Sequence, residues 1–182
     1  MPHSLILGGV RSGKSQLAET MVAESKGPAT YIATATAGDT EMHARIQQHQ
    51  QRRPKHWALI EEPIALGDVL NAQQRINKSA EPNATHNQAP SLLIDCMSLW
   101  LSNLLHAGDA VFEQEKQKFL AALDNYSGDV VIVSNEVGFG IIGMDPLTRR
   151  FADELGWLNQ ALAKKCERVV LTVAGLPQAL KG

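Results

Sequence analysis

A glycine-rich segment near the start of the chain carries the residues best suited to chemistry. It matches the pattern G-x-x-x-x-G-K-[ST] at every specified position. Its members are Gly8, Gly9, Val10, Arg11, Ser12, Gly13, Lys14 and Ser15. Glycines let such a loop turn tightly and bring backbone N–H groups close to a phosphate, which a Cβ would obstruct. The pattern predicts a phosphate-binding loop (P-loop) for a nucleoside triphosphate, with Lys14 at the β- and γ-phosphates and Ser15 binding Mg²⁺.

The surroundings of this segment decide between a functional loop and a chance match in a glycine-rich turn. Residues 4–7 form a short apolar run, and residues 15–25 place Leu17, Met21 and Val22 at helical spacing. A strand therefore leads into the loop and a helix follows it. Because a helix N-terminus favours anions, this context supports phosphate binding.

Asp95 follows the apolar run Leu92, Leu93 and Ile94, which is typical of a parallel strand buried on both faces. P-loop enzymes hold Mg²⁺ with an acidic residue at the end of such a strand. An aspartate there can also cap the next helix. We favour the metal-side role because the P-loop predicts such a residue.

A polar stripe at residues 41–53 offers a second chemistry. Glu41, Arg45, His49 and Arg53 follow one another at i, i+4 spacing, so a helix would align them on one face. A solvated face with salt-bridging pairs is the simpler interpretation. However, the imidazole of His49 could act as a nucleophile, with nearby arginines neutralising phosphate charge in a covalent nucleotidyl intermediate.

The remaining pattern alternates strands and helices. We expect strands at 30–33, 57–60, 92–94, 130–133 and 169–173, the last before Gly175, and helices at 41–53, 64–76, 97–105, 111–126 and 147–166. Residues 77–90 are expected to form an exposed loop. With the P-loop, this predicts one domain spanning residues 1–182, an α/β, P-loop NTPase-like (RecA-like) sandwich with a mostly parallel sheet.

The composition of the chain limits the classes of binding partner that we expect. The chain has 182 residues, 44% hydrophobic and 20% charged, with a net charge of −2, which predicts a globular protein without a nucleic-acid partner. The sequence has neither a signal peptide nor an apolar run long enough for membrane insertion, so we expect a cytoplasmic protein. Cys96 and Cys166 lack metal-site spacing and are expected to be buried thiols.

Several blocks along nearly the whole chain resemble the bifunctional adenosylcobinamide kinase / adenosylcobinamide-phosphate guanylyltransferase family of cobalamin biosynthesis. Besides the P-loop, the similar blocks are Tyr31 to Ala35, Glu41 to Trp57, Asp95 to Leu105, Ser134 to Ile141, and Arg150 to Gln160. The family often has proline after the segment that ends at Ile142, where this chain has Gly143.

The resemblance implies two reactions, phosphorylation of the aminopropanol hydroxyl of adenosylcobinamide and transfer of GMP from GTP to the resulting adenosylcobinamide phosphate. GTP or ATP would serve the kinase step, with Mg²⁺, and His49 would carry GMP. The implied nucleotide-contacting residues outside the P-loop are Thr34, Ala35, Thr36, Gln50, Gln51, Arg52, Arg53, Glu61 and Asp95. The family also implies a homo-oligomer, a trimer.

Two other functions remain open from the sequence. One is a P-loop small-molecule kinase without guanylyltransferase activity. The other is a nucleotide-dependent switch module, in which triphosphate binding only changes conformation.

Overall fold

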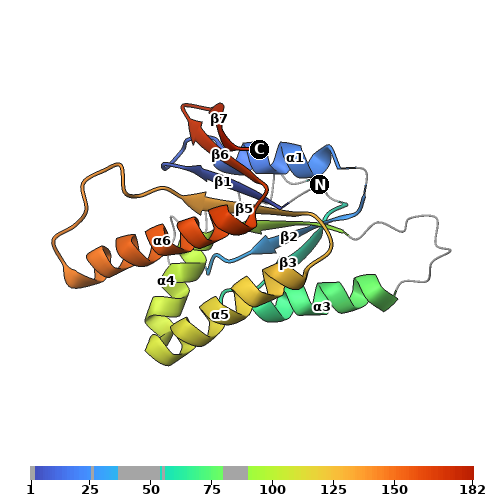
Figure 1. The fold of residues 1–182 in the computed structure, drawn as a ribbon, viewed down its shortest axis with the longest axis horizontal. Helices are drawn as coiled ribbons and strands as arrows, with labels where there is room; N and C mark the ends of the chain where they lie inside the picture. The colour runs from blue at the N-terminus through green and yellow to red at the C-terminus, as the bar shows by residue number, and fades with distance from the viewer. Residues whose placement is uncertain (1–2, 26, 37–53, 55, 80–89) are drawn as a thin grey trace.

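The computed structural model describes residues 3–25, 27–36, 54, 56–79 and 90–182. They form a seven-stranded sheet in the order β3-β2-β4-β5-β1-β6-β7, flanked by helices (Figure 1). The elements are β1 (Ser4–Gly8), α1 (Lys14–Ala23), β2 (Ala29–Ala33), β3 (Ala58–Glu61), α3 (Leu66–Ser79), β4 (Ser91–Asp95), α4 (Met97–Ala107), α5 (Asp109–Asn125), β5 (Val130–Asn135), α6 (Pro146–Lys165), β6 (Arg168–Val173) and β7 (Leu176–Lys181).

The strands are parallel except for β7, which pairs antiparallel with β6. Successive side chains of a strand point to opposite faces, so the buried strands supply two cores. Ile6 and Leu93 pack with α1 on one face. Leu5 and Leu92 pack on the other face with α3, α4, α5 and α6, as the layers in Figure 1 show. The predicted mostly parallel α/β sandwich is confirmed.

The expected strands and helices within the described residues are present, with small shifts at their ends. The helix at 41–53 lies outside the described residues. The helix expected at 147–166 is α6, and its residues Leu155, Leu158 and Leu162 all lie in the core. The amphipathic spacing of these leucines therefore predicted the correct buried face.

Two expectations at element ends were wrong. Strand 169–173 is not the last, because β6 continues through a two-residue turn into β7. Both turn residues, Ala174 and Gly175, have positive φ angles of 51° and 80°, which suit a tight hairpin. Residues 77–79 are also not loop, since α3 extends to Ser79. Asn77 Nδ2 donates a 3.3 Å hydrogen bond to the Tyr126 hydroxyl, a long-range contact that local sequence does not reveal.

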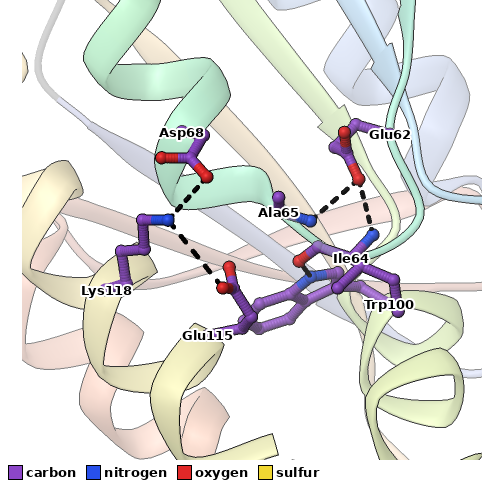
Figure 2. A network of polar contacts seen from close by, with 7 residues as sticks. All are labelled: Glu62, Ile64, Ala65, Asp68, Trp100, Glu115 and Lys118. Carbon is purple, nitrogen blue, oxygen red and sulfur yellow. Dashed lines mark hydrogen bonds and ion pairs between the residues drawn. The ribbon is translucent and has the colours of Figure 1, made fainter. Parts of the chain in front are cut away.

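The start of α3 is held by side chains from its own loop and from α4 (Figure 2). Glu62 Oε1 accepts hydrogen bonds from the backbone N–H groups of Ile64 and Ala65, at 2.9 and 2.8 Å. The Trp100 indole donates to the Ile64 carbonyl at 2.7 Å. These bonds satisfy polar groups at a helix end and fix the loop that follows β3.

Helix α3 also packs closely on α5. A Cβ on Gly67 would lie 2.8 Å from Cγ and 2.9 Å from the backbone carbon of Lys118, so only glycine fits at this crossing. Lys118 forms ion pairs with Asp68 of α3 at 2.5 Å and with Glu115 of its own helix at 3.8 Å (Figure 2). The crossing thus fixes the first turn of α3 against α5.

The two cysteines are free thiols in different environments. Cys166 is buried, as expected, and burial raises its pKa to about 12. Cys96 is partly buried against the core, and burial is also the main cause that raises the pKa of its thiol. None of the helices in the described part of the chain has the length and apolar character needed to cross a membrane.

Candidate nucleotide-binding site

The predicted site residues that the structure describes gather at one edge of the sheet. Parallel strands end at the same edge, and register pairs Gly8 of β1 with Asn135 of β5. Ala33 of β2 is paired with Asp95 of β4 on one side and with Glu61 of β3 on the other. Ligands of open α/β sheets bind at this carboxyl edge.

The P-loop connects β1 to α1 through residues whose backbone conformations favour glycine. Gly8 and Gly13 have φ angles of 153° and 96°. A Cβ on Gly8 would also lie 2.5 Å from the Thr172 carbonyl oxygen, so the position admits no side chain. The loop closes on itself where Ser12 N–H donates to the Gly9 carbonyl at 3.3 Å. The glycines of the motif therefore meet geometric requirements of this fold.

Lys14 begins α1 and turns back into its own loop. Its Nζ donates a 2.6 Å hydrogen bond to the Gly9 carbonyl, and the residue is 8% exposed. Burial lowers the pKa of this ammonium, while the nearby Cys96 and Asp95 oppose the shift. A partly desolvated cation within the loop would interact more strongly with phosphate than a solvated one.

Asp95 lies at the end of β4 and is held by Tyr31 of β2. The Tyr31 hydroxyl donates to Asp95 Oδ2 at 3.1 Å. Burial and the Asp95 carboxylate both raise the pKa of Tyr31, so the phenol keeps its proton and remains a donor. Cys96, rather than Asp95, is the N-cap residue of α4. The capping alternative for Asp95 therefore does not hold.

Thr34 joins the ends of β2 and β4. It is fully buried, and its N–H donates to the Asp95 carbonyl at 3.2 Å. Its hydroxyl donates to the Cys96 carbonyl at 2.8 Å and accepts from the Cys96 N–H at 2.9 Å. Asn103 Nδ2 donates to the carbonyls of Thr34, at 2.9 Å, and Pro63, at 3.1 Å. The loops after β2, β3 and β4 are thus tied together.

The other predicted nucleotide contacts divide into two sets. Ala35 is half-buried, whereas Thr36 and Glu61 are exposed at the same edge, where a ligand could reach them. His49, Gln50, Gln51, Arg52 and Arg53 lie outside the described residues, as do Glu41 and Arg45.

The chemistry of Ser15 and Asp95 suits Mg²⁺, which prefers oxygen ligands and keeps few of them from protein. Ser15 follows Lys14 at the start of α1, and Asp95 is close enough to Lys14 to influence its pKa. In the described part of the chain, no three His, Cys, Asp or Glu side chains form a metal-binding group. A metal ion at this site would thus be bound by the side-chain oxygens of Ser15 and Asp95 and by the phosphates of the nucleotide.

Sequence reasoning missed three roles at this site. Tyr31 and Asn103 lie in blocks that resemble the family, but the sequence does not reveal that Tyr31 contacts Asp95 or that Asn103 contacts Thr34. Thr172, which contacts Ser12, was overlooked entirely. Its only signal is a hydroxyl among the apolar residues 169–173 of β6, and that pattern does not identify a partner.

The fold and the loop define a P-loop nucleotide-binding protein of the α/β class. The structure of a protein from Pyrococcus horikoshii OT3 is similar, with TM-score 0.56 and 11% identity. The match covers 100% of this chain and 86% of that protein's chain. The flagellar accessory protein FlaH from Methanocaldococcus jannaschii gives TM-score 0.50 at 11% identity, with 99% and 78% coverage. At such identities the likeness concerns the fold alone.

Residues 4–180 match the family model described as cobinamide kinase / cobinamide phosphate guanyltransferase, and the chain belongs to this family. The bifunctional adenosylcobalamin biosynthesis protein CobP of Pseudomonas aeruginosa is 48% identical over 99% of this chain and 98% of its own length. CobU of Escherichia coli K12, with the same description, is 37% identical over 97% and 98%. The protein is therefore an enzyme of the cobinamide kinase and guanyltransferase class.

Proposed function

We propose that this protein phosphorylates adenosylcobinamide with a nucleoside triphosphate and then transfers GMP from GTP to give adenosylcobinamide-GDP. The observation that carries the proposal is the P-loop at the carboxyl edge of the sheet, with Lys14 inside it and Asp95 close by. The family match over residues 4–180 supports both reactions.

In the kinase step, the backbone N–H groups of the P-loop bind the triphosphate and Lys14 exchanges its bond to the Gly9 carbonyl for phosphate oxygens. Ser15 and Asp95 would hold Mg²⁺, which neutralises phosphate charge when bound. Tyr31 keeps the Asp95 carboxylate in place through its 3.1 Å hydrogen bond. Positioning and charge neutralisation supply most of the catalysis in phosphoryl transfers of this kind.

In the guanylyl step, the His49 imidazole attacks the α-phosphorus of GTP, and the bond to the departing pyrophosphate breaks. The product is a phosphoramidate between His49 and GMP. An oxygen of adenosylcobinamide phosphate then attacks the same phosphorus and releases the histidine. Arg45, Arg52 and Arg53, which flank His49 in sequence, would neutralise the phosphate charge.

The remaining features of the proposal rest on the family resemblance. Thr34 to Thr36, Gln50 to Arg53, and Glu61 would complete the nucleotide contacts. The enzyme would act as a single domain of residues 1–182, in the cytoplasm, as a homotrimer.

The deciding experiment is incubation of the pure protein with Mg²⁺ and GTP labelled in the α-phosphate. We expect one GMP per chain at His49, in a bond labile to acid and comparatively stable to alkali. His49→Ala should lose both the label and GMP transfer but retain some kinase activity, because the P-loop is unchanged. His43→Ala, from the same predicted helix, is the matched control and should keep the label.

Undiminished labelling of His49→Ala, or mass mapping of GMP to another residue, would contradict the covalent mechanism. A protein that phosphorylates cobinamide without ever acquiring GMP would be a kinase alone. A protein that binds GTP without either reaction would be a nucleotide-dependent switch.

A further inference from the structure

Thr172 of β6 stands directly beside the P-loop and is 1% exposed. It pairs in register with Gly8, the first residue of the loop. Its hydroxyl donates a 2.9 Å hydrogen bond to the Leu7 carbonyl. Because that bond uses its only hydrogen, the 2.9 Å contact between Thr172 Oγ1 and Ser12 Oγ has Ser12 as the donor. A buried chain of hydrogen bonds thus runs from Ser12 through Thr172 to Leu7.

The turn after β6 holds the same loop residue at its backbone. Gly175 N–H donates to the Ser12 carbonyl at 2.9 Å. A Cβ on Gly13 would lie only 3.2 Å from the Cα of Gly175, so the turn packs against the residue that precedes Lys14. Ser12 is therefore fixed through both its side chain and its carbonyl by one hairpin.

Ser12 occupies a position where the P-loop pattern accepts any residue, so its anchoring is a property of this chain rather than of the motif. The next three residues, Gly13, Lys14 and Ser15, are those assigned to the phosphates and the metal. Holding Ser12 restricts the backbone from which they extend. A binding site whose backbone is fixed in advance loses less entropy when the ligand binds.

We infer that Thr172 is a positioning residue for the triphosphate, acting through Ser12 on the backbone of the P-loop. The inference rests on the proposed function in one respect, namely that residues 8–15 bind the triphosphate. Its effect falls on the affinity for nucleotide, because Thr172 contacts the loop rather than the transferred phosphoryl group.

The test compares wild type with Thr172→Val, which keeps the shape of the side chain and removes its hydroxyl, and with Thr172→Ser, which restores the hydroxyl. Calorimetric titration with GTP and Mg²⁺ gives the dissociation constant, steady-state kinetics give KM and kcat, and thermal unfolding monitors the fold. Thr20→Val is the matched control, because among the described residues the hydrogen bond of that hydroxyl stays within α1, to the Gln16 carbonyl, at 3.0 Å.

Thr172→Val loses both the bond to the Leu7 carbonyl and the bond from Ser12. We expect it to weaken GTP binding about tenfold and to raise KM more than it lowers kcat, which is within the range for the loss of buried hydrogen bonds. Thr172→Ser should restore binding, and Thr20→Val should leave it unchanged. A folded Thr172→Val protein with wild-type affinity would overturn the inference, and so would failure of Thr172→Ser to restore binding.

If Thr172→Val does not fold, Ser12→Ala removes the same hydrogen bond from the side of the loop. Weakened GTP binding in folded Ser12→Ala then supports the inference, and unchanged binding overturns it. The proposed function fails separately, through absence of GTP binding by the wild-type protein.

Discussion

Two loops leave neighbouring strands at the same edge of the sheet and differ in how they are held. The P-loop follows β1, and residues 136–145, here called the 136–145 loop, follow β5. They begin side by side, since Glu136 N–H donates to the Gly8 carbonyl at 3.0 Å. The P-loop then packs against β6, whereas the 136–145 loop runs outward to α6 (Figure 1).

The side chains of the P-loop divide into two sets, because Val10 and Arg11 are exposed whereas its anchoring residues are not. Ser12 and Lys14 are buried and hydrogen-bonded. In the 136–145 loop, Phe139 is 82% exposed and Met144 is 92% exposed. A loop that binds phosphate through backbone N–H groups needs a fixed backbone, and this one is fixed by tertiary contacts. Apolar side chains left in water contribute little to the stability of the 136–145 loop.

The largest expected effect is that of Lys14→Ala on catalysis. We expect the kinase rate to fall about 10²- to 10³-fold, because a preorganised charge at the phosphates is removed. The fold should persist, since burial already disfavours this charge, as its lowered pKa indicates. Rates and thermal unfolding should be measured beside Lys164→Ala, an exposed lysine of α6, as the control. Wild-type turnover in folded Lys14→Ala would remove the functional distinction between the two loops.

A matched pair of glycine substitutions compares how much each loop contributes to the free energy of unfolding. Gly8→Ala should destabilise the fold by about 1–3 kcal/mol or more, because the added Cβ would overlap Thr172. In Gly140→Ala, the added Cβ would have none of the described residues within 4 Å, so the free energy of unfolding should change by less than about 0.5 kcal/mol. Urea unfolding measures both values. Equal destabilisation by the two substitutions would show that the loops are equally constrained.

The smallest effect concerns the end of the 136–145 loop, where Asp145 caps α6. Its carboxylate accepts from the Thr148 hydroxyl and, at 2.8 Å, from the Thr148 N–H, and these hydrogen bonds lower its pKa below the ordinary 3.8. A carboxyl with a lowered pKa in the folded state stabilises that state above pH 3.8, and this contribution is lost as the pH falls through the folded pKa.

Asp145→Asn keeps a capping oxygen and removes the titration. Melting temperatures of wild type and Asp145→Asn should therefore differ most above pH 3.8 and converge in more acidic solution. A difference that does not depend on pH would mean that the charge of Asp145 adds nothing to the cap.

Much of the fold could be predicted because its signals are local. The apolar run before Asp95 indicated β4, the spacing of Leu155, Leu158 and Leu162 indicated α6, and the glycines indicated the P-loop. Backbone conformation and side-chain periodicity depend on neighbours in sequence, so short patterns carry them. The sequence alone thus determined the class of fold, the position of the P-loop and, through its family blocks, the type of enzyme. The phosphate contacts of the P-loop residues and the roles of His49 and its neighbours stay predictions.

Other features were decided only by tertiary structure. Thr172 lies 160 residues after Ser12, and Tyr31 lies 64 residues before Asp95, yet each pair shares a hydrogen bond. The strand β7 was missed as well, although its hairpin supplies the bond from Gly175 to Ser12. The P-loop pattern predicts which residues contact the phosphates, but it does not predict which residues support the loop from the neighbouring strand. Such partners are brought together by strand order and register, which depend on packing of the whole sheet rather than on any local pattern.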